Sequence, residues 1–392
     1  MNPTGQLASR FPLVARPRPA CTPLVERVAD LGQRARDAQR DSDLAAASAV
    51  HNLAALLASD CGLPDLARQW CHRHVNLYLH AHPLNAQVAR HALEPLVNLA
   101  RLHIRDGHGE RAFDLLDTLY TAVSSQTAAT IDGAAIPAHL TNTPQAHQEV
   151  RRWLWAVLLA TGARALAVAG HWEQARIRLR DYKGIGRRML DGRQVAVIAH
   201  ATTGDTDGAL ALLDDTQPGQ PWENAVTACL TTQCRRGSDN ADLDALLERY
   251  HTLNTSAPGL AVFHTRLGLS LIDAIGTVDN PHAHQIALDL IDRTTTGQDG
   301  YTAHDVLTHN GCLSLLTTTQ QRELTNLVQA CALGNGLIPA TLLADLTAAL
   351  DTTEEVITRM MTGETSTLDG RARRVIRVNK SASDGGQAGR QE

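Results

Sequence analysis

Aromatic residues are scarce in this sequence, at 3% of 392 residues, although hydrophobic residues make up 43%. Aliphatic side chains and alanine must therefore build the core, and small residues suit helices that pack closely. Valine, isoleucine, tyrosine and phenylalanine do not alternate with polar residues over any long run, which argues against a β-sheet. The chain also lacks a run of about 18 apolar residues, so we expect no membrane-spanning helix.

Closely spaced cysteine pairs are absent as well. The seven cysteines include no C-x-x-C pair, and an odd number without a regular spacing indicates free thiols in a reducing cytoplasm. Three arginines near the N-terminus are followed by no apolar stretch, so we expect no signal peptide and a cytoplasmic location. The formal net charge of −5 argues against general nucleic-acid binding.

The sequence does contain a recurring pair of small residues. A glycine is followed five residues later by an alanine in four places, each between two stretches of helical periodicity: Gly62 and Ala67, Gly107 and Ala112, Gly170 and Ala175, and Gly204 and Ala209. Glycine ends a helix in the left-handed conformation without strain. Alanine one turn into the next helix lets the two helices cross closely, so the pattern predicts helical hairpins.

These hairpins resemble tetratricopeptide repeats. The resemblance rests on Asn-Leu-Ala before two of the glycines (52–54 and 98–100) and on Gly-His-Trp-Glu-Gln-Ala at 170–175. The step from Gly170 to Gly204 is 34 residues, which is the period of that family. The resemblance covers about residues 40–250. It implies an all-α fold, a right-handed α-solenoid of tetratricopeptide-like helical hairpins with a concave face near its middle.

The composition divides the chain into four regions. Residues 1–23 contain five prolines and three arginines and are predicted to be a flexible leader. Residues 24–250 hold the repeats, and residues 251–361 have a helical spacing that predicts a continuation or a cap. Residues 362–392 have six basic residues and little to bury, so we expect a disordered basic tail.

An insertion at about residues 124–146 interrupts the repeats. Asp132-Gly133 predicts a turn, and Pro137 and Pro144 argue against helix nearby. A loop of this length in a compact array is either functional or disordered.

Segment 151–193 carries ten basic and three acidic residues, a net charge of +7. A glycine pair at 184 and 186 precedes two arginines, and backbone N–H groups beside arginines can bind an anion. One interpretation is a pocket for an acidic peptide, a phosphate or a nucleotide, with these ligand-binding residues: Arg152, Lys183, Arg187 and Arg188. The other interpretation is a solvated helix face that complements the acidic segment 201–250.

Asn52 and Asn98 occupy nearly equivalent positions on the first helices of two hairpins. The tetratricopeptide resemblance implies that Asn98, and less directly Asn52, binds the backbone of a peptide ligand through its amide donor and carbonyl acceptor. The other interpretation is a surface or capping asparagine.

Histidines two apart occur at 72 and 74, 80 and 82, and 282 and 284. On a helix such pairs point to different faces, whereas ligands on one face need a spacing of three or four. We therefore expect no metal site and no cofactor. H-E-x-x-H, G-x-S-x-G and Walker-type motifs are absent, so no catalytic residue is identified.

These patterns favour a cytoplasmic adaptor or regulatory sensor that binds a peptide or protein partner on the concave face of its solenoid. One alternative is an enzyme on an all-helical scaffold. It would act on an anionic small molecule held by the arginines of segment 151–193, with a histidine as acid or base. The other alternative is a structural assembly module.

Overall fold

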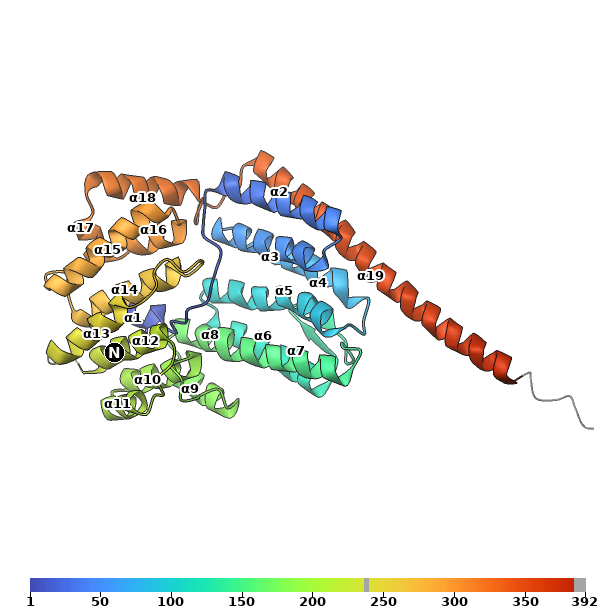
Figure 1. Ribbon diagram of the computed structural model, residues 1–392, viewed down its shortest axis with the longest axis horizontal. Coiled ribbons are helices and arrows are strands. Elements are labelled where there is room, and N and C mark those ends of the chain that lie inside the picture. Colours follow the sequence, from blue (N-terminus) through green and yellow to red (C-terminus); the bar gives the residue numbers. More distant parts are fainter. Residues whose placement is uncertain (236–239, 384–392) are drawn as a thin grey trace, which may run out of the picture.

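The computed structural model is all-α apart from two three-residue strands, and its helices lie in two adjacent stacks (Figure 1). It describes residues 1–235 and 240–383; within these, the side chains of 6–7, 240–242 and 364–383 are not described. No helix in this described part is long and apolar enough to cross a membrane. All seven cysteines are free thiols.

The first stack consists of helices that pack against their neighbours along the chain. Its elements are α2 (Leu24–Asp41), α3 (Leu44–Asp60), α4 (Pro64–Leu79), α5 (Ala86–Arg105), α6 (Gly109–Ser125), α7 (Pro144–Val157), the π-helical turn η1 (Leu158–Gly162) and α8 (Ala163–Val168). The helix formed by α7, η1 and α8 packs along α6.

The second stack begins at α9, which follows α8 and contacts it at the lower left end of the first stack in Figure 1. Its helices are α9 (Trp172–Asp181), α10 (Asp191–Thr203), α11 (Thr206–Asp214), α12 (Pro221–Cys234), α13 (Asn240–His251), α14 (Ala261–Ile275), α15 (Pro281–Gly297), α16 (Gly300–Leu307), α17 (Asn310–Leu315) and α18 (Thr318–Ala330). A short helix near the N-terminus, α1 (Gln6–Arg10), packs between α8 and α14.

The repeated glycines form the turns that the sequence predicts. All four lie in the left-handed region, with φ between +77° and +86°. After each of them, the next backbone N–H returns to a carbonyl five residues earlier, for example from Leu63 to Ala58 and from His108 to His103. This is the hydrogen bond of a Schellman cap. The four partner alanines are at most 1% exposed, as close helix crossing requires.

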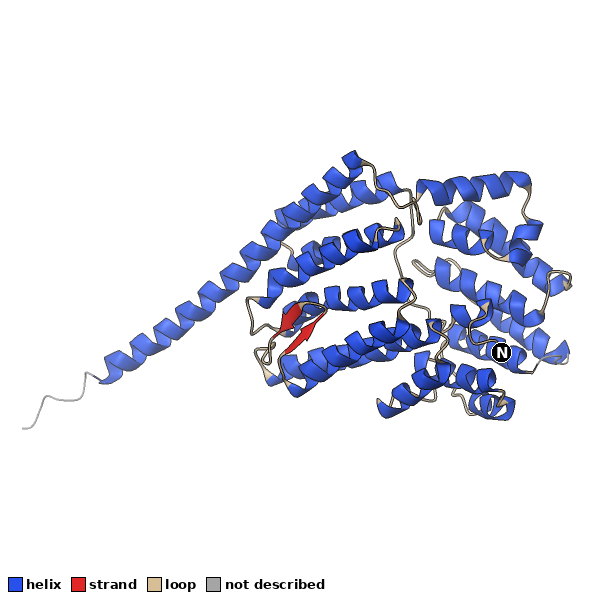
Figure 2. Ribbon diagram, turned by 180° about the vertical axis from the view of Figure 1, so that it is seen from behind, coloured by secondary structure: helices blue, strands red, loops and turns tan. Residues whose placement is uncertain are grey.

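The predicted insertion at 124–146 is ordered. Strands β1 (Ala129–Ile131) and β2 (Ala134–Ile136) form a hairpin against α6 and α4 (Figure 2). Asp132 and Gly133 both have positive φ, +46° and +86°, which is the two-residue turn of a tight hairpin. Pro144 was expected to exclude helix, but it is the first residue of α7. Proline is tolerated there, because the backbone N–H of the first helical residue makes no hydrogen bond within the helix.

The chain closes on itself through α19 (Ala340–Ser383), which packs against α2, α3 and α4. Before it, Gly334 and Gly336 donate backbone hydrogen bonds of 2.7 Å to the carbonyls of Asp60 and Cys61 at the end of α3. The predicted cap therefore returns to the first stack. Residues from 362 were expected to be disordered, but the helix continues through Ser383, and this stretch contains no proline that would interrupt it. Residues 384–392 lie outside the described residues.

Asp60 is the buried carboxylate at this closure, and its side chain is 2% exposed. It accepts from Arg27 on α2 at 3.1 Å and from Arg105 on α5 at 2.9 Å. Tyr301 on α16 donates a third hydrogen bond. One charged group thus joins two helices of the first stack to one of the second.

Three histidines lie in the core of the first stack. His51 on α3 stacks on His74 of α4 with ring centroids 4.7 Å apart, and His91 on α5 lies beyond Tyr78. Both ring nitrogens of His51 are buried without a hydrogen-bond partner, whereas Nδ1 of the partly buried His91 lies 3.9 Å from a carboxylate oxygen of Glu94. Burial, helped by the charge of Arg73, lowers the pKa of His51 to about 3, and burial also holds the pKa of His74 well below its usual range.

These histidines predict acid sensitivity. Unfolded histidine titrates near pH 6.5, so below that pH the unfolded chain binds protons that the native state excludes. The free energy of unfolding should fall as the pH drops, by about 1.4 kcal/mol per pH unit for His51 alone, until the pH nears its folded pKa. Denaturant melts between pH 7 and 5 should show a shallower pH dependence in His51→Leu. Replacement of the exposed His284 by alanine is the control, and equal slopes in both variants would contradict this account.

A second prediction concerns the contact between α6 and α8. A β-carbon on Gly109 would lie 2.1 Å from the carbonyl oxygen of Ala165, which belongs to the backbone and cannot move aside. Gly109→Ala should therefore lower the free energy of unfolding by about 1–3 kcal/mol through overpacking. Gly297→Ala is the matched control, because its β-carbon would meet nothing within 4 Å. Chemical melts of the two variants test this, and two equal results would rule out the close crossing.

Candidate functional site

The N-terminal segment, residues 1–23, lies between the two stacks and runs from α1 to the start of α2 (Figure 1). Ala8, Phe11, Leu13 and Cys21 are buried, each at most 4% exposed. The expectation of a flexible leader is therefore corrected. Its five prolines limit the backbone freedom lost on ordering, and burial of its apolar side chains offsets part of the remaining cost. We call the surfaces of α5, α8, α10, α14 and α16 that surround the segment the inner face.

Gln194 on α10 binds the backbone of this segment. Its side-chain oxygen accepts from the N–H of Leu13 at 2.6 Å, and its side-chain nitrogen donates to the carbonyl of Leu13 at 2.7 Å. The same nitrogen donates to the carbonyl of Met189 at 3.1 Å, and Gln194 is fully buried. A side-chain amide that pairs with the backbone N–H and the carbonyl of one residue can recognise an extended chain independently of that residue's side chain.

Further backbone contacts follow along the segment. The Arg18 N–H donates to the carbonyl of Gly259 at 3.0 Å. The Cys21 N–H donates to a carboxylate oxygen of Asp299 at 3.1 Å, and the Cys21 carbonyl accepts from the Gly300 N–H at 2.8 Å. Residues 13 to 21 are thus held by hydrogen bonds that depend little on the segment's own side chains.

Carboxylates of the inner face pair with the arginines of the segment. Arg16 makes a two-pronged contact with Asp191 at 3.1 and 2.5 Å, and Arg10 pairs with Asp273. Burial acts to raise the pKa of the Asp273 carboxyl, but hydrogen bonds from His309 and Arg10 outweigh it and the pKa lies below its usual range. Asp273 is therefore ionised at neutral pH and attracts a cation.

Beside α1 lies a cavity of about 200 Å³ lined by Arg10, Arg164 on α8, and Arg266, Asp305 and His309 of the second stack. Arg266 donates to Asp305 at 2.8 Å. Arg164 has no hydrogen-bond or ion-pair partner among the described residues. Burial, followed by the charges of Arg266 and Arg18, lowers its pKa to about 10, so the guanidinium remains charged at neutral pH. The wall of the cavity therefore carries a charged guanidinium, that of Arg164, without a carboxylate partner in the described part of the chain.

The two asparagines predicted from the repeat pattern come together. Asn98 donates to Asn52 at 2.8 Å, Asn52 donates to Glu94 at 2.9 Å, and Arg101 donates to Asn98 at 2.8 Å. The two amides therefore bond to each other and to charged side chains of α5.

The predicted basic residues lie apart from this arrangement. Arg187 pairs with Asp215 at 2.5 Å, and Arg188 pairs with the buried carboxylate of Glu223 at 2.8 Å. Both acids belong to the segment 201–250 that the sequence analysis named as a complement. Arg152 is exposed and bonds to a carbonyl of its own helix, and Lys183 is exposed with a φ of +54°.

Sequence reasoning missed the residues that hold the segment, namely Gln194, Asp191, Asp273 and Asp299. Gln194 precedes the apolar run Val-Ala-Val-Ile-Ala of α10, and it is itself fully buried. A lone amide beside such a run was the available signal, because a buried polar group needs a partner. Arg164 was counted in the basic segment but not singled out.

The Gln194 contact predicts how tightly the segment is held. Gln194→Leu leaves the N–H and carbonyl of Leu13 unpaired, which should ease opening of the segment by about 2 kcal/mol and speed its amide exchange about 30-fold. Hydrogen–deuterium exchange across residues 8–23 measures this. Arg16→Ala removes a partly exposed ion pair and should change the rate much less. Equal protection in both variants would contradict the role of Gln194.

Comparison with known proteins returns no match, whether the chain is scanned against family models, curated proteins or solved structures. The resemblance to tetratricopeptide repeats accordingly rests on the residues quoted for it.

Proposed function

We propose that this protein binds an extended segment of a partner protein on its inner face. The helical hairpins form a solenoid of the tetratricopeptide-like type, and residues 1–23 occupy its binding surface in cis. The observation that carries this proposal is the paired hydrogen bonding of Gln194 to the backbone of Leu13. Recognition of backbone by a buried amide suits a polypeptide ligand rather than a metabolite.

The contacts of the N-terminal segment indicate the chemistry of the partner. Asp191 and Asp273 bind arginines, and buried sites hold Phe11 and Leu13. Prolines keep the segment extended and lower the entropy lost on binding. The partner segment would therefore be extended, rich in proline, and carry arginines around two apolar anchors.

Occupation in cis supports a regulatory role. A partner can bind only in the fraction of molecules whose own segment has left the inner face, so its apparent dissociation constant rises by the inverse of that fraction. Any signal that loosens the segment would increase binding. The adaptor would then respond to a change at its own N-terminus.

A second candidate ligand is a small anion, and Arg164 favours it. An unpaired guanidinium in a cavity can accept a carboxylate or a phosphate. Catalysis there has weaker support, because both nitrogens of His309 are engaged. Its Nδ1 accepts from the Cys312 N–H at 3.2 Å, and its Nε2 lies 3.1 Å from Asp273. Neither nitrogen is free for proton transfer to a bound molecule.

A fluorescent peptide of residues 8–23, with Cys21→Ser, tests the proposal on the full chain. Wild-type protein should bind it weakly, since its own segment competes. Phe11→Ala combined with Leu13→Ala in the protein should release that segment and tighten peptide binding at least about 10-fold. Fluorescence anisotropy reports the affinity, and circular dichroism confirms that the variants remain helical.

Two further variants make this test specific. Gln194→Leu added to the released protein should remove the gain in affinity, whereas Arg152→Ala should leave it unchanged. The proposal is refuted if release of the segment does not tighten binding, or if both additional variants bind alike. For the second candidate, inorganic phosphate should raise the melting temperature of the wild type but not of Arg164→Gln.

A further inference from the structure

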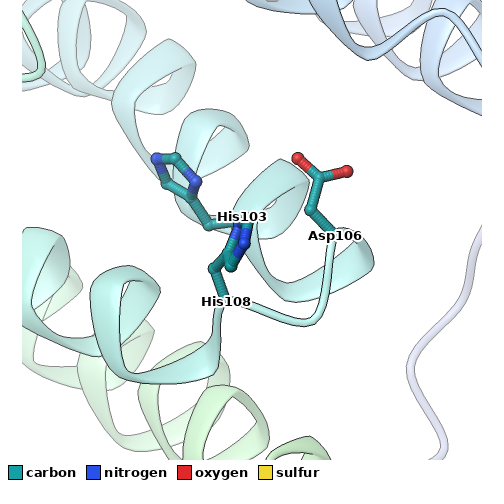
Figure 3. A group of neighbouring side chains, drawn as sticks. All are labelled: His103, Asp106 and His108. Carbon is teal, nitrogen blue, oxygen red and sulfur yellow. The ribbon is translucent and has the colours of Figure 1, made fainter.

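A second group of side chains meets at the turn between α5 and α6, away from the contacts of the N-terminal segment. His103 lies in the last turn of α5, Asp106 directly follows that helix, and His108 directly precedes α6 (Figure 3). One ligand atom from each residue lies within 4.8 Å of the other two. The left-handed Gly107, at φ +79°, reverses the chain and brings the three together.

His103 is the unexplained member of this group. It is 3% exposed, and neither of its ring nitrogens has a hydrogen-bond partner. Burying an unpaired polar group costs free energy, so a buried imidazole normally has a partner. A neutral imidazole carries one nitrogen lone pair, and on His103 no hydrogen bond occupies it.

We propose that His103, Asp106 and His108 bind a divalent first-row transition ion, with Zn²⁺ as the ion that the donor set fits best. Two imidazole nitrogens and one carboxylate oxygen are its ordinary protein ligands. Asp106 and His108 are exposed, so the remaining coordination position faces water. The ion would supply the partner that His103 lacks.

The surroundings are compatible with a cation. Arg68 donates to one oxygen of Asp106, which fixes the orientation of the carboxylate and leaves its other oxygen for the ion. Arg111 lies 3.5 Å from Asp132, so the second nearby guanidinium faces a carboxylate of its own. Among the described residues, no other three histidine, cysteine or carboxylate side chains come together in this way.

Titration of the full chain with Co²⁺ and Zn²⁺ tests the site. Co²⁺ should bind at one ion per chain with visible absorption bands, and Zn²⁺ should displace it. Zn²⁺ should also raise the melting temperature. His108→Ala and Asp106→Asn should each weaken binding at least about 10-fold and abolish the thermal shift. His108 is exposed and makes no capping hydrogen bond, so its removal should leave the fold intact.

His284→Ala is the matched control, because His284 is an exposed histidine on a different helix and should not affect binding. The site is refuted if the full chain binds no ion at equimolar concentrations. It is also refuted if His108→Ala and Asp106→Asn bind as tightly as His284→Ala, since the ion would then sit elsewhere.

Discussion

The buried carboxylate of Asp60 connects parts of this molecule that are far apart in sequence. It joins α2, α5 and α16 through Arg27, Arg105 and Tyr301. Arg27 also donates to the carbonyl of Cys331 at 2.6 Å, close to where the chain turns back toward α19. A carboxylate at this depth is stable only while its donors remain, so the two stacks and the closure depend on one another.

The closure of the chain and the N-terminal segment are in contact. Residues 8–23 lie between the two stacks (Figure 1), and the segment contacts the chain before α19 through a hydrogen bond from the Cys331 thiol to the Cys21 carbonyl at 3.0 Å. The polar contacts of the segment are of two kinds, hydrogen bonds to its backbone and ion pairs between its arginines and carboxylates. The backbone hydrogen bonds tolerate a segment of different sequence, whereas the ion pairs select a segment that carries arginines. An inner face built in this way suits exchange between an internal segment and a partner of similar chemistry.

The sequence predicted the local features and missed the long-range ones. Each Gly-x4-Ala turn was predictable because glycine's left-handed conformation and alanine's small volume act within one hairpin. Asp132-Gly133 was predictable for the same reason. The path of the N-terminal segment was not, because an extended proline-rich stretch has no periodicity and its partners, such as Gln194 and Asp299, lie far along the chain. The turn at His103 was missed because only histidine pairs within one helix were considered.

The central claim is that the N-terminal segment is an exchangeable ligand of the inner face. Double electron–electron resonance tests it most directly, because it measures the distance between two spin labels, here at Ala20→Cys and Thr118→Cys. Cys234→Ser removes the only native cysteine that is not buried, so that it is not labelled. The protein alone should give one narrow distance distribution, because its own segment occupies the inner face. Saturation with the peptide of residues 8–23 should convert it to a broad distribution. A broad distribution without peptide, or an unchanged narrow one when peptide is bound, would contradict the account.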